Sequence, residues 1–243
     1  MLPLFRKEIS GFFSSLTGYI VISLFLLANS LLMWIFPGQF NVLDTGYATV
    51  DSLFILAPWI FLFLVPAVTM RMIAEEKKSG TLELLLSRPL TELQIILAKY
   101  FASLVLVLLS LLPTLVFVLS VYLLGDPVGN IDLGGTAGSF IGLFFLASVY
   151  VAAGIFASSL TGNQVIAFIL AAVISFVLYA GFDSLGSLPS LAGINEIVTG
   201  LGINEHYKSM SRGVVDSRDI VYFLCINSFI ILLNKLVLQS RRW

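Results

Sequence analysis

An uncharged interval of fifty residues, Leu133 to Phe182, constrains this chain more than any other feature of its sequence. A continuous helix of that length would extend about 75 Å, whereas the hydrocarbon core of a bilayer is about 30 Å thick. The interval must therefore fold back on itself. Its turn-like segment is Ser158-Ser-Leu-Thr-Gly-Asn-Gln164. The sequence thus predicts two antiparallel spans joined by a tight connection.

Composition extends this expectation to the whole chain of 243 residues. Hydrophobic residues make up 58% and charged residues 11%, against roughly 45–50% and 25% in soluble domains. We therefore expect a single-domain, all-α polytopic membrane protein rather than a large soluble core. Six apolar runs are long enough to cross a bilayer: residues 16–36, 52–72, 99–124, 136–158, 164–182 and 220–238.

The N-terminal residues 2–15 are expected to form a helix that lies in the membrane interface. Phe5, Ile9 and Phe12 recur on one helical face, and Arg6 and Lys7 take much of the other side. An apolar face opposed by basic residues is typical of helices that bind membrane lipid in the plane of the bilayer.

The densest cluster of charges lies between the second and third spans, at residues 73–91. It also contains a leucine patch that a loop in water would not need: Leu82, Leu84, Leu85 and Leu86. The patch predicts a short transverse helix with an apolar face on which another protein docks.

Local signals give the boundaries of this short helix. Ser79-Gly80 can end the preceding helix, and Thr81 is expected to cap the short one. Pro89 should end it, and Thr91 with Gln94 fits a capping box that opens the next long helix.

Small residues recur at four-residue spacing in the fourth and fifth spans. They are Gly138 and Gly142 in the fourth, and Ala167, Ala171 and Ser175 in the fifth. Such stripes let helices approach closely. Packing within the chain and packing against a second subunit both remain open.

The basic residues predict the orientation. Ten of the thirteen Lys and Arg residues fall on the face that carries both termini and the 73–91 stretch; Lys208, Arg212 and Arg218 fall on the other. The positive-inside rule therefore places both termini and the 73–91 stretch in the cytoplasm, and the 183–218 connection outside.

Several chemistries are missing from the sequence. There is no G-x-x-x-x-G-K-[ST] loop for ATP, no hydrolase or zinc-protease motif, and no pair of acids within a span. His206, the single histidine, has no partners at ligand spacing, so we predict no metal site. A net charge of −1 argues against nucleic acid as a partner. We expect a non-enzyme whose energy source is external.

Residues 75–91, Glu-Glu-Lys-Lys-Ser-Gly-Thr-Leu-Glu-Leu-Leu-Leu-Ser-Arg-Pro-Leu-Thr, resemble the motif that follows the second span in ABC-2-type permeases, the membrane subunits of type V ABC transporters. The order of interfacial helix, six spans and a long loop before the sixth is similar to that family across essentially the whole chain. Residues 205–222 resemble its small bacterial branch, which includes gliding-motility-associated permeases and nitrous-oxide-reductase maturation permeases.

The resemblance implies a permease of the bacterial inner membrane that couples ATP hydrolysis by a separate cytoplasmic ATPase dimer to substrate movement or mechanical work. ATP and Mg would be bound by that ATPase, and a second permease subunit, the same or related, would complete the assembly. The 73–91 stretch would be the coupling helix region. Its implied coupling residues are Glu75, Glu76, Ser79, Gly80, Thr81, Leu82, Glu83, Leu85, Leu86, Arg88 and Pro89. In that family the interfacial helix also touches the ATPase.

Two other classes of function stay open. A membrane anchor or scaffold of a surface or motility machine would share every feature above without moving a substrate. An intramembrane enzyme is the weaker alternative, because the spans offer no nucleophile paired with a base.

Overall fold

The structure is a computed structural model that describes residues 1–87, 90–188, 195–213 and 215–240. These residues form helices, turns and loops with no strand, and six helical segments are long and apolar enough to cross a membrane. The predicted all-α class with six spans is therefore confirmed.

The spans are assembled as follows, with π segments in the first and fifth and a 3-10 turn in the third: α2 (Leu16–Ser30) with η1 (Leu31–Ile35); α4 (Asp51–Thr69); α7 (Glu92–Leu111) with η2 (Leu112–Thr114) and α8 (Leu115–Leu124); α9 (Leu133–Leu160); α10 (Gln164–Phe176) with η3 (Val177–Gly181) and α11 (Phe182–Gly186); and α14 (Ser217–Gln239). The shorter helices are α1 (Leu2–Ser14), α3 (Val42–Thr45), α5 (Ala74–Lys78), α6 (Thr81–Leu86), α12 (Asn195–Gly200) and α13 (Ile203–Ser211).

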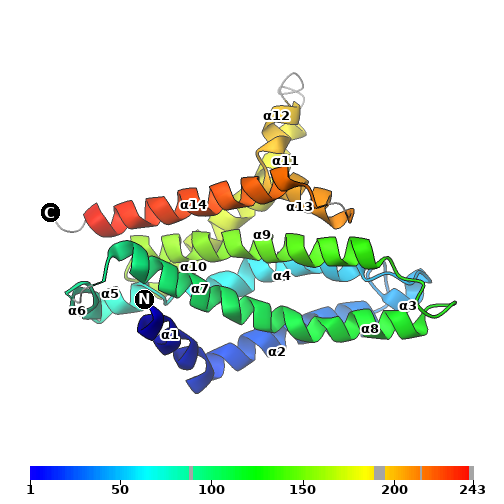
Figure 1. Cartoon of the computed structure of the whole chain (residues 1–243), viewed down its shortest axis with the longest axis horizontal. Helices are drawn as coiled ribbons and strands as arrows, with labels where there is room; N and C mark the ends of the chain where they lie inside the picture. Colours follow the sequence, from blue (N-terminus) through cyan, green and yellow to red (C-terminus); the bar gives the residue numbers. More distant parts are fainter. Residues whose placement is uncertain (88–89, 189–194, 214, 241–243) are drawn as a thin grey trace.

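Helix α9 is the centre of the bundle. It packs against α4, α7, α10, α13 and α14, and it is the most buried of the six spans. Figure 1 shows α5 and α6 at one end of the bundle, which we call the α6 end. Helix α3 lies at the opposite end and α13 lies near that end, which we call the α13 end; α11 and α12 project sideways from the bundle.

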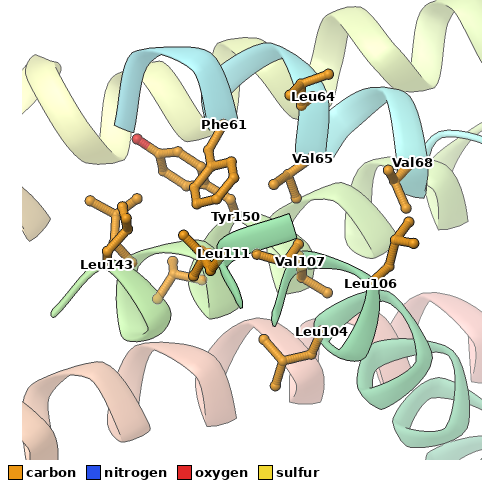
Figure 2. Packing of buried hydrophobic residues seen from close by; sticks show 14 of the residues in the cluster. Phe61, Leu64, Val65, Val68, Leu104, Leu106, Val107, Leu111, Leu143 and Tyr150 are labelled. Carbon is orange, nitrogen blue, oxygen red and sulfur yellow. The ribbon is translucent and has the colours of Figure 1, made fainter. Parts of the chain in front are cut away.

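The core forms where α4, α7 and α9 meet. Figure 2 shows Phe61 and Val65 of α4 close to Val107 of α7 and Tyr150 of α9, all of them buried. Lipid is as apolar as these side chains, so their tight packing, rather than removal from water, holds the spans together.

The small-residue stripe of the fifth span is used inside this chain. The buried residues of α10 are Ala167, Ala171 and Ser175, each 0% exposed, and α10 packs against α9 and α4. The stripe therefore lets α10 approach its own bundle closely, and in this arrangement it is covered.

The glycine stripe of the fourth span holds a helix of the long connection rather than another span. A Cβ atom at Gly138 would overlap the carbonyl oxygen of Met210, and one at Gly142 would lie 3.2 Å from side-chain atoms of Met210 and Tyr207. Tyr207 also donates a hydrogen bond of 2.7 Å to the carbonyl of Phe54. Burial raises the pKa of Tyr207, which keeps its hydroxyl a donor. Helix α13 is thereby fixed on α9 and α4.

The closest approach of α9 and α4 gives the first prediction. Because a Cβ atom at Gly154 would overlap Oγ1 of the buried Thr69, Gly154→Ala should lower the free energy of unfolding by about 1–3 kcal/mol. Gly11→Ala is the matched control, since a Cβ there meets nothing within 4 Å, and alanine in a helix is neutral or stabilising. Unfolding in detergent measures both. Equal stability of the two variants would contradict the close approach, and adding Thr69→Ala should rescue Gly154→Ala.

Candidate functional site

The second span is interrupted before the charged stretch, and one side chain of α9 stabilises the interruption. Residues 70–73 leave the helical form between α4 and α5. The Ser158 hydroxyl accepts hydrogen bonds from the backbone N–H groups of Ile73 and Ala74, at 3.0 and 2.9 Å, and donates one to the carbonyl of Met70 at 2.9 Å. The sequence predicted this serine to be part of a turn. Its hydroxyl instead supplies hydrogen-bond partners to the buried backbone groups that the interruption of the helix leaves unpaired.

The corner between α5 and α6 lies where the sequence predicted it. Gly80 has a φ of +69°, in the left-handed region that glycine adopts without strain, so the predicted helix end is confirmed. The prediction that Thr81 caps α6 was wrong. Gly80 occupies the N-cap position, and no side chain caps the helix. Thr81 lies one residue too far into the helix to cap it, and its hydroxyl is 2.9 Å from that of Ser79 instead.

The predicted start of α7 is confirmed. Thr91 Oγ1 accepts a hydrogen bond of 3.3 Å from the N–H of Gln94, and Gln94 Oε1 accepts one of 3.2 Å from the N–H of Thr91. This reciprocal pair is a complete capping box, which fixes where the third span begins.

The leucines of α6 point in different directions. Leu82 is 6% exposed and belongs to the core, whereas Leu84 is 68% exposed. Leu85 is half-buried and packs against the small cluster formed by Leu4, Ile95 and Ala98. Leu84 is not among the coupling residues that the sequence predicted, although α6 presents it outward. Arg88 and Pro89 lie outside the described residues, as does the side chain of Leu86.

Helix α1 lies against the start of the third span. Phe12 is 2% exposed, and Phe5 and Ile9 are partly buried against the core. Arg6 and Lys7 are exposed on the other side, as the helical pattern predicts. Helix α1 packs against α7 and α2. The apolar face of α1 is therefore largely taken up by this chain's own helices.

The two segments singled out from the sequence meet at the α6 end. An apolar groove of about 630 Å³ runs between α1 and α6, lined by Met1, Pro3 and Leu4 on one side and by Leu84, Leu85 and Leu90 on the other. The 73–91 stretch and helix α1 thus form one surface, although they are far apart in the chain.

A buried ion network joins that surface to the third span. Lys99 of α7 has a side chain that is 1% exposed, and its Nζ lies 3.0 Å from Glu8 Oε1 of α1 and 2.8 Å from Glu76 Oε1 of α5. Lys7 lies 3.8 Å from the same two oxygens. Lys99 thereby ties three helices together, whereas Glu75 and Glu83 are exposed.

The α13 end has a second polar cluster that sequence reasoning missed. His206 Nδ1 lies 2.7 Å from Asp219 Oδ1, its Nε2 lies 3.0 Å from the carbonyl of Gly200, and its ring stacks on Tyr222 at 3.7 Å. These contacts tie α13 to α12 and to the start of α14. The described residues hold no group of three His, Cys, Asp or Glu side chains that could bind a metal.

These features define a helical protein with six candidate membrane spans and an apolar groove at its α6 end, next to a buried ion network. A sequence model of the ABC-2 family transporter proteins matches residues 39–237. The chain therefore belongs to the ABC-2 family, and it is a multi-pass membrane permease of an ABC transporter, whose family works with an ABC ATPase subunit. No curated protein matches the chain.

The ion network gives the second prediction. Lys99→Met leaves two carboxylates close together without their buried cation, so it should lower the free energy of unfolding by about 3–5 kcal/mol. Adding Glu8→Gln and Glu76→Gln should restore most of this loss, since the neutral amides no longer need the cation. Lys78→Met, at an exposed lysine of α5, serves as the control and should have little effect. Thermal unfolding of the purified permease tests the series, and a harmless Lys99→Met would refute the network's structural role.

Proposed function

We propose that the α6 end of this permease docks a cytoplasmic ATPase dimer and transmits the movements driven by ATP hydrolysis into the bundle. The observation that carries the proposal is the apolar groove that α1 and α6 share. Amphipathic helices commonly bind in grooves of this kind. In this proposal the chain resides in the bacterial inner membrane with both termini in the cytoplasm.

The exposure of Leu84 supports a partner at this place. A well-buried leucine contributes about 1.5–3 kcal/mol of transfer free energy, before ordering costs are subtracted. Because Leu84 is 68% exposed and lies beside the half-buried Leu85, an ATPase helix in the groove would remove both from water. Leu82 instead packs in the core and holds α6 on the bundle, so that α6 would present a fixed surface to the ATPase helix.

Movement of α6 would reach the spans by two routes in this proposal. One runs through the Gly80 corner into α5 and across the Ser158-bonded interruption to α4. The other runs through Lys99, which joins α5 to α7 and α1. Each route includes buried polar contacts, those of Ser158 and those of Lys99, which rearrange between discrete states rather than stretch.

The assignment to one branch of the family follows the resemblance of residues 205–222. We propose that the chain belongs to the small bacterial branch that includes gliding-motility-associated permeases, and that it works with a second permease subunit, the same or related. The residues that carry this resemblance, 205–222, form most of α13 and the beginning of α14. Stimulated ATP turnover in the reconstituted complex would distinguish a permease from a passive membrane anchor.

The third prediction tests docking. Leu84→Asp removes the apolar contact and places a carboxylate in the groove, so affinity for the ATPase should fall at least about tenfold. Leu43→Asp is the matched control, because Leu43 is a 63% exposed leucine of α3 at the opposite end. Glu83→Ala should be milder, at most about 1 kcal/mol, since Glu83 is an exposed charge.

The measurement is recovery of the ATPase on purified permease, together with thermal stability of each variant. If the Leu84→Asp permease is stable and recovers as much ATPase as the Leu43→Asp permease does, the docking proposal is wrong.

The fourth prediction concerns orientation. Single cysteines at Gly80 and at Tyr47, in a chain whose Cys225 is replaced by serine, should react from opposite sides of the membrane. A membrane-impermeant thiol reagent added to whole cells should label the Tyr47 variant and spare the Gly80 variant until the membrane is opened. Labelling of Gly80 in whole cells would place the groove outside and remove any role for a cytoplasmic ATPase.

A further inference from the structure

A second cavity lies at the α13 end, where no role has been assigned. It has a volume of about 710 Å³ and lies between the first turns of α4, the end of the fifth span and α13. We call it the α13 cavity. Its volume falls within the range of about 300–1,000 Å³ that is typical of pockets for small ligands. Its lining combines an aromatic wall with a charged rim.

The aromatic wall consists of Phe54 and Trp59 of α4 and Tyr179 of η3. The rings of Trp59 and Tyr179 meet edge to face, with centroids 5.5 Å apart. Trp59 is 45% exposed, and the neighbouring Ile55 is 53% exposed, so the wall continues onto the apolar outside of the bundle. An acyl chain in the bilayer could therefore extend from the cavity without leaving an apolar surface.

The charged rim carries both signs. It contains the carboxylates of Asp51 and Asp183 and the cations Lys208 and Arg212. Asp183 Oδ2 accepts hydrogen bonds from the Asn204 amide and from Lys208 Nζ, the latter at 3.3 Å. Among the described residues, Asp51 and Arg212 have no ion pair with each other or with a third group. The carboxylate of Asp51 and the guanidinium of Arg212 are thus available to a charged ligand in the cavity.

Asp183 also contributes to the charged rim. Its side chain is 30% exposed, and its second carboxylate oxygen, Oδ1, has no hydrogen-bond partner among the described residues. A cationic donor on a ligand would add a charge-assisted hydrogen bond to this carboxylate.

The geometry points to the α13 cavity as a binding site for a zwitterionic amphiphile, whose ammonium group meets Asp183 and Asp51, whose phosphate meets Arg212, and whose apolar chain lies along Trp59. A head with a primary ammonium group and a phosphate matches the rim in sign and number. A purely anionic head would leave Asp51 unpaired, and a purely cationic one would leave Arg212 unpaired. The inference concerns binding at the end opposite the ATPase groove and stands apart from docking.

Trp59 provides the means of testing this site. The chain has three tryptophans, so Trp34→Phe with Trp243→Phe leaves Trp59 as the single fluorescent reporter. The purified permease, without ATPase, is held in non-ionic detergent and titrated with lysophosphatidylethanolamine carrying a brominated chain, which quenches tryptophan on contact. Lysophosphatidylglycerol with the same brominated chain is the matched ligand, since it keeps the phosphate and lacks the ammonium group.

Half-quenching by the ethanolamine compound should occur at a concentration about tenfold lower than by the glycerol compound, because a hydrogen bond to a charged group is worth about a factor of ten or more. Asp183→Asn and Asp51→Asn should each reduce this preference. Arg212→Gln should weaken both ligands by a similar factor, since both carry the phosphate. Asp126→Asn and Arg218→Gln, at exposed positions that do not line the cavity, should leave both curves unchanged.

Equal half-quenching concentrations for the two ligands would overturn the inference, and so would a preference that survives in both Asp51→Asn and Asp183→Asn. Asp51→Asn guards against a folding artefact, because Asp51 does not share the contacts that Asp183 makes with α13. Since no ATPase takes part, failure of the docking prediction would leave this result unaffected, and the reverse also holds.

Discussion

The hydroxyl of Ser158 is the contact on which the α6 end of this permease depends. An interrupted helix leaves backbone groups without their intrahelical partners, and inside a membrane protein water cannot replace them freely. Ser158 accepts from two N–H groups and donates to one carbonyl, so a single side chain of α9 satisfies the interruption between α4 and α5. The second span can therefore change direction at a buried position, and α5 and α6 can turn across the end of the bundle.

The remaining contacts of that end depend on this change of direction. Once α5 leaves the line of α4, Glu76 comes within 2.8 Å of the buried Lys99, which also holds Glu8 of α1. The network brings α1 beside α6, and the apolar groove between them follows. The charges are worth more as positioning contacts than as stabilising ones, because a buried ion pair often gains little over well-packed apolar residues.

Local sequence signals were sufficient for the class, the six spans, the Gly80 corner and the capping box of Thr91 and Gln94, since each depends on residues close together in the chain. The error at Thr81 was a shift of one residue, the ordinary uncertainty at a helix end. Contacts between distant residues could not be predicted. Ser158 lies 84 residues from Ala74 in the chain and Lys99 lies 91 from Glu8, and the outward direction of Leu84 depends on how α6 lies on the bundle.

Helix α9 connects the two ends of the molecule, and its contacts differ in kind between them. At the α6 end it is held by the hydrogen bonds of Ser158, whereas at the α13 end Gly138 and Gly142 hold α13 by close packing. Sliding α5 past α9 would leave two shielded N–H groups without acceptors, at a cost of about 1–3 kcal/mol each. The interruption should therefore move together with α9. A shift of α9 in turn carries α13, which is packed on its glycines and forms one wall of the α13 cavity. The two ends are thus mechanically linked through one helix of 28 residues.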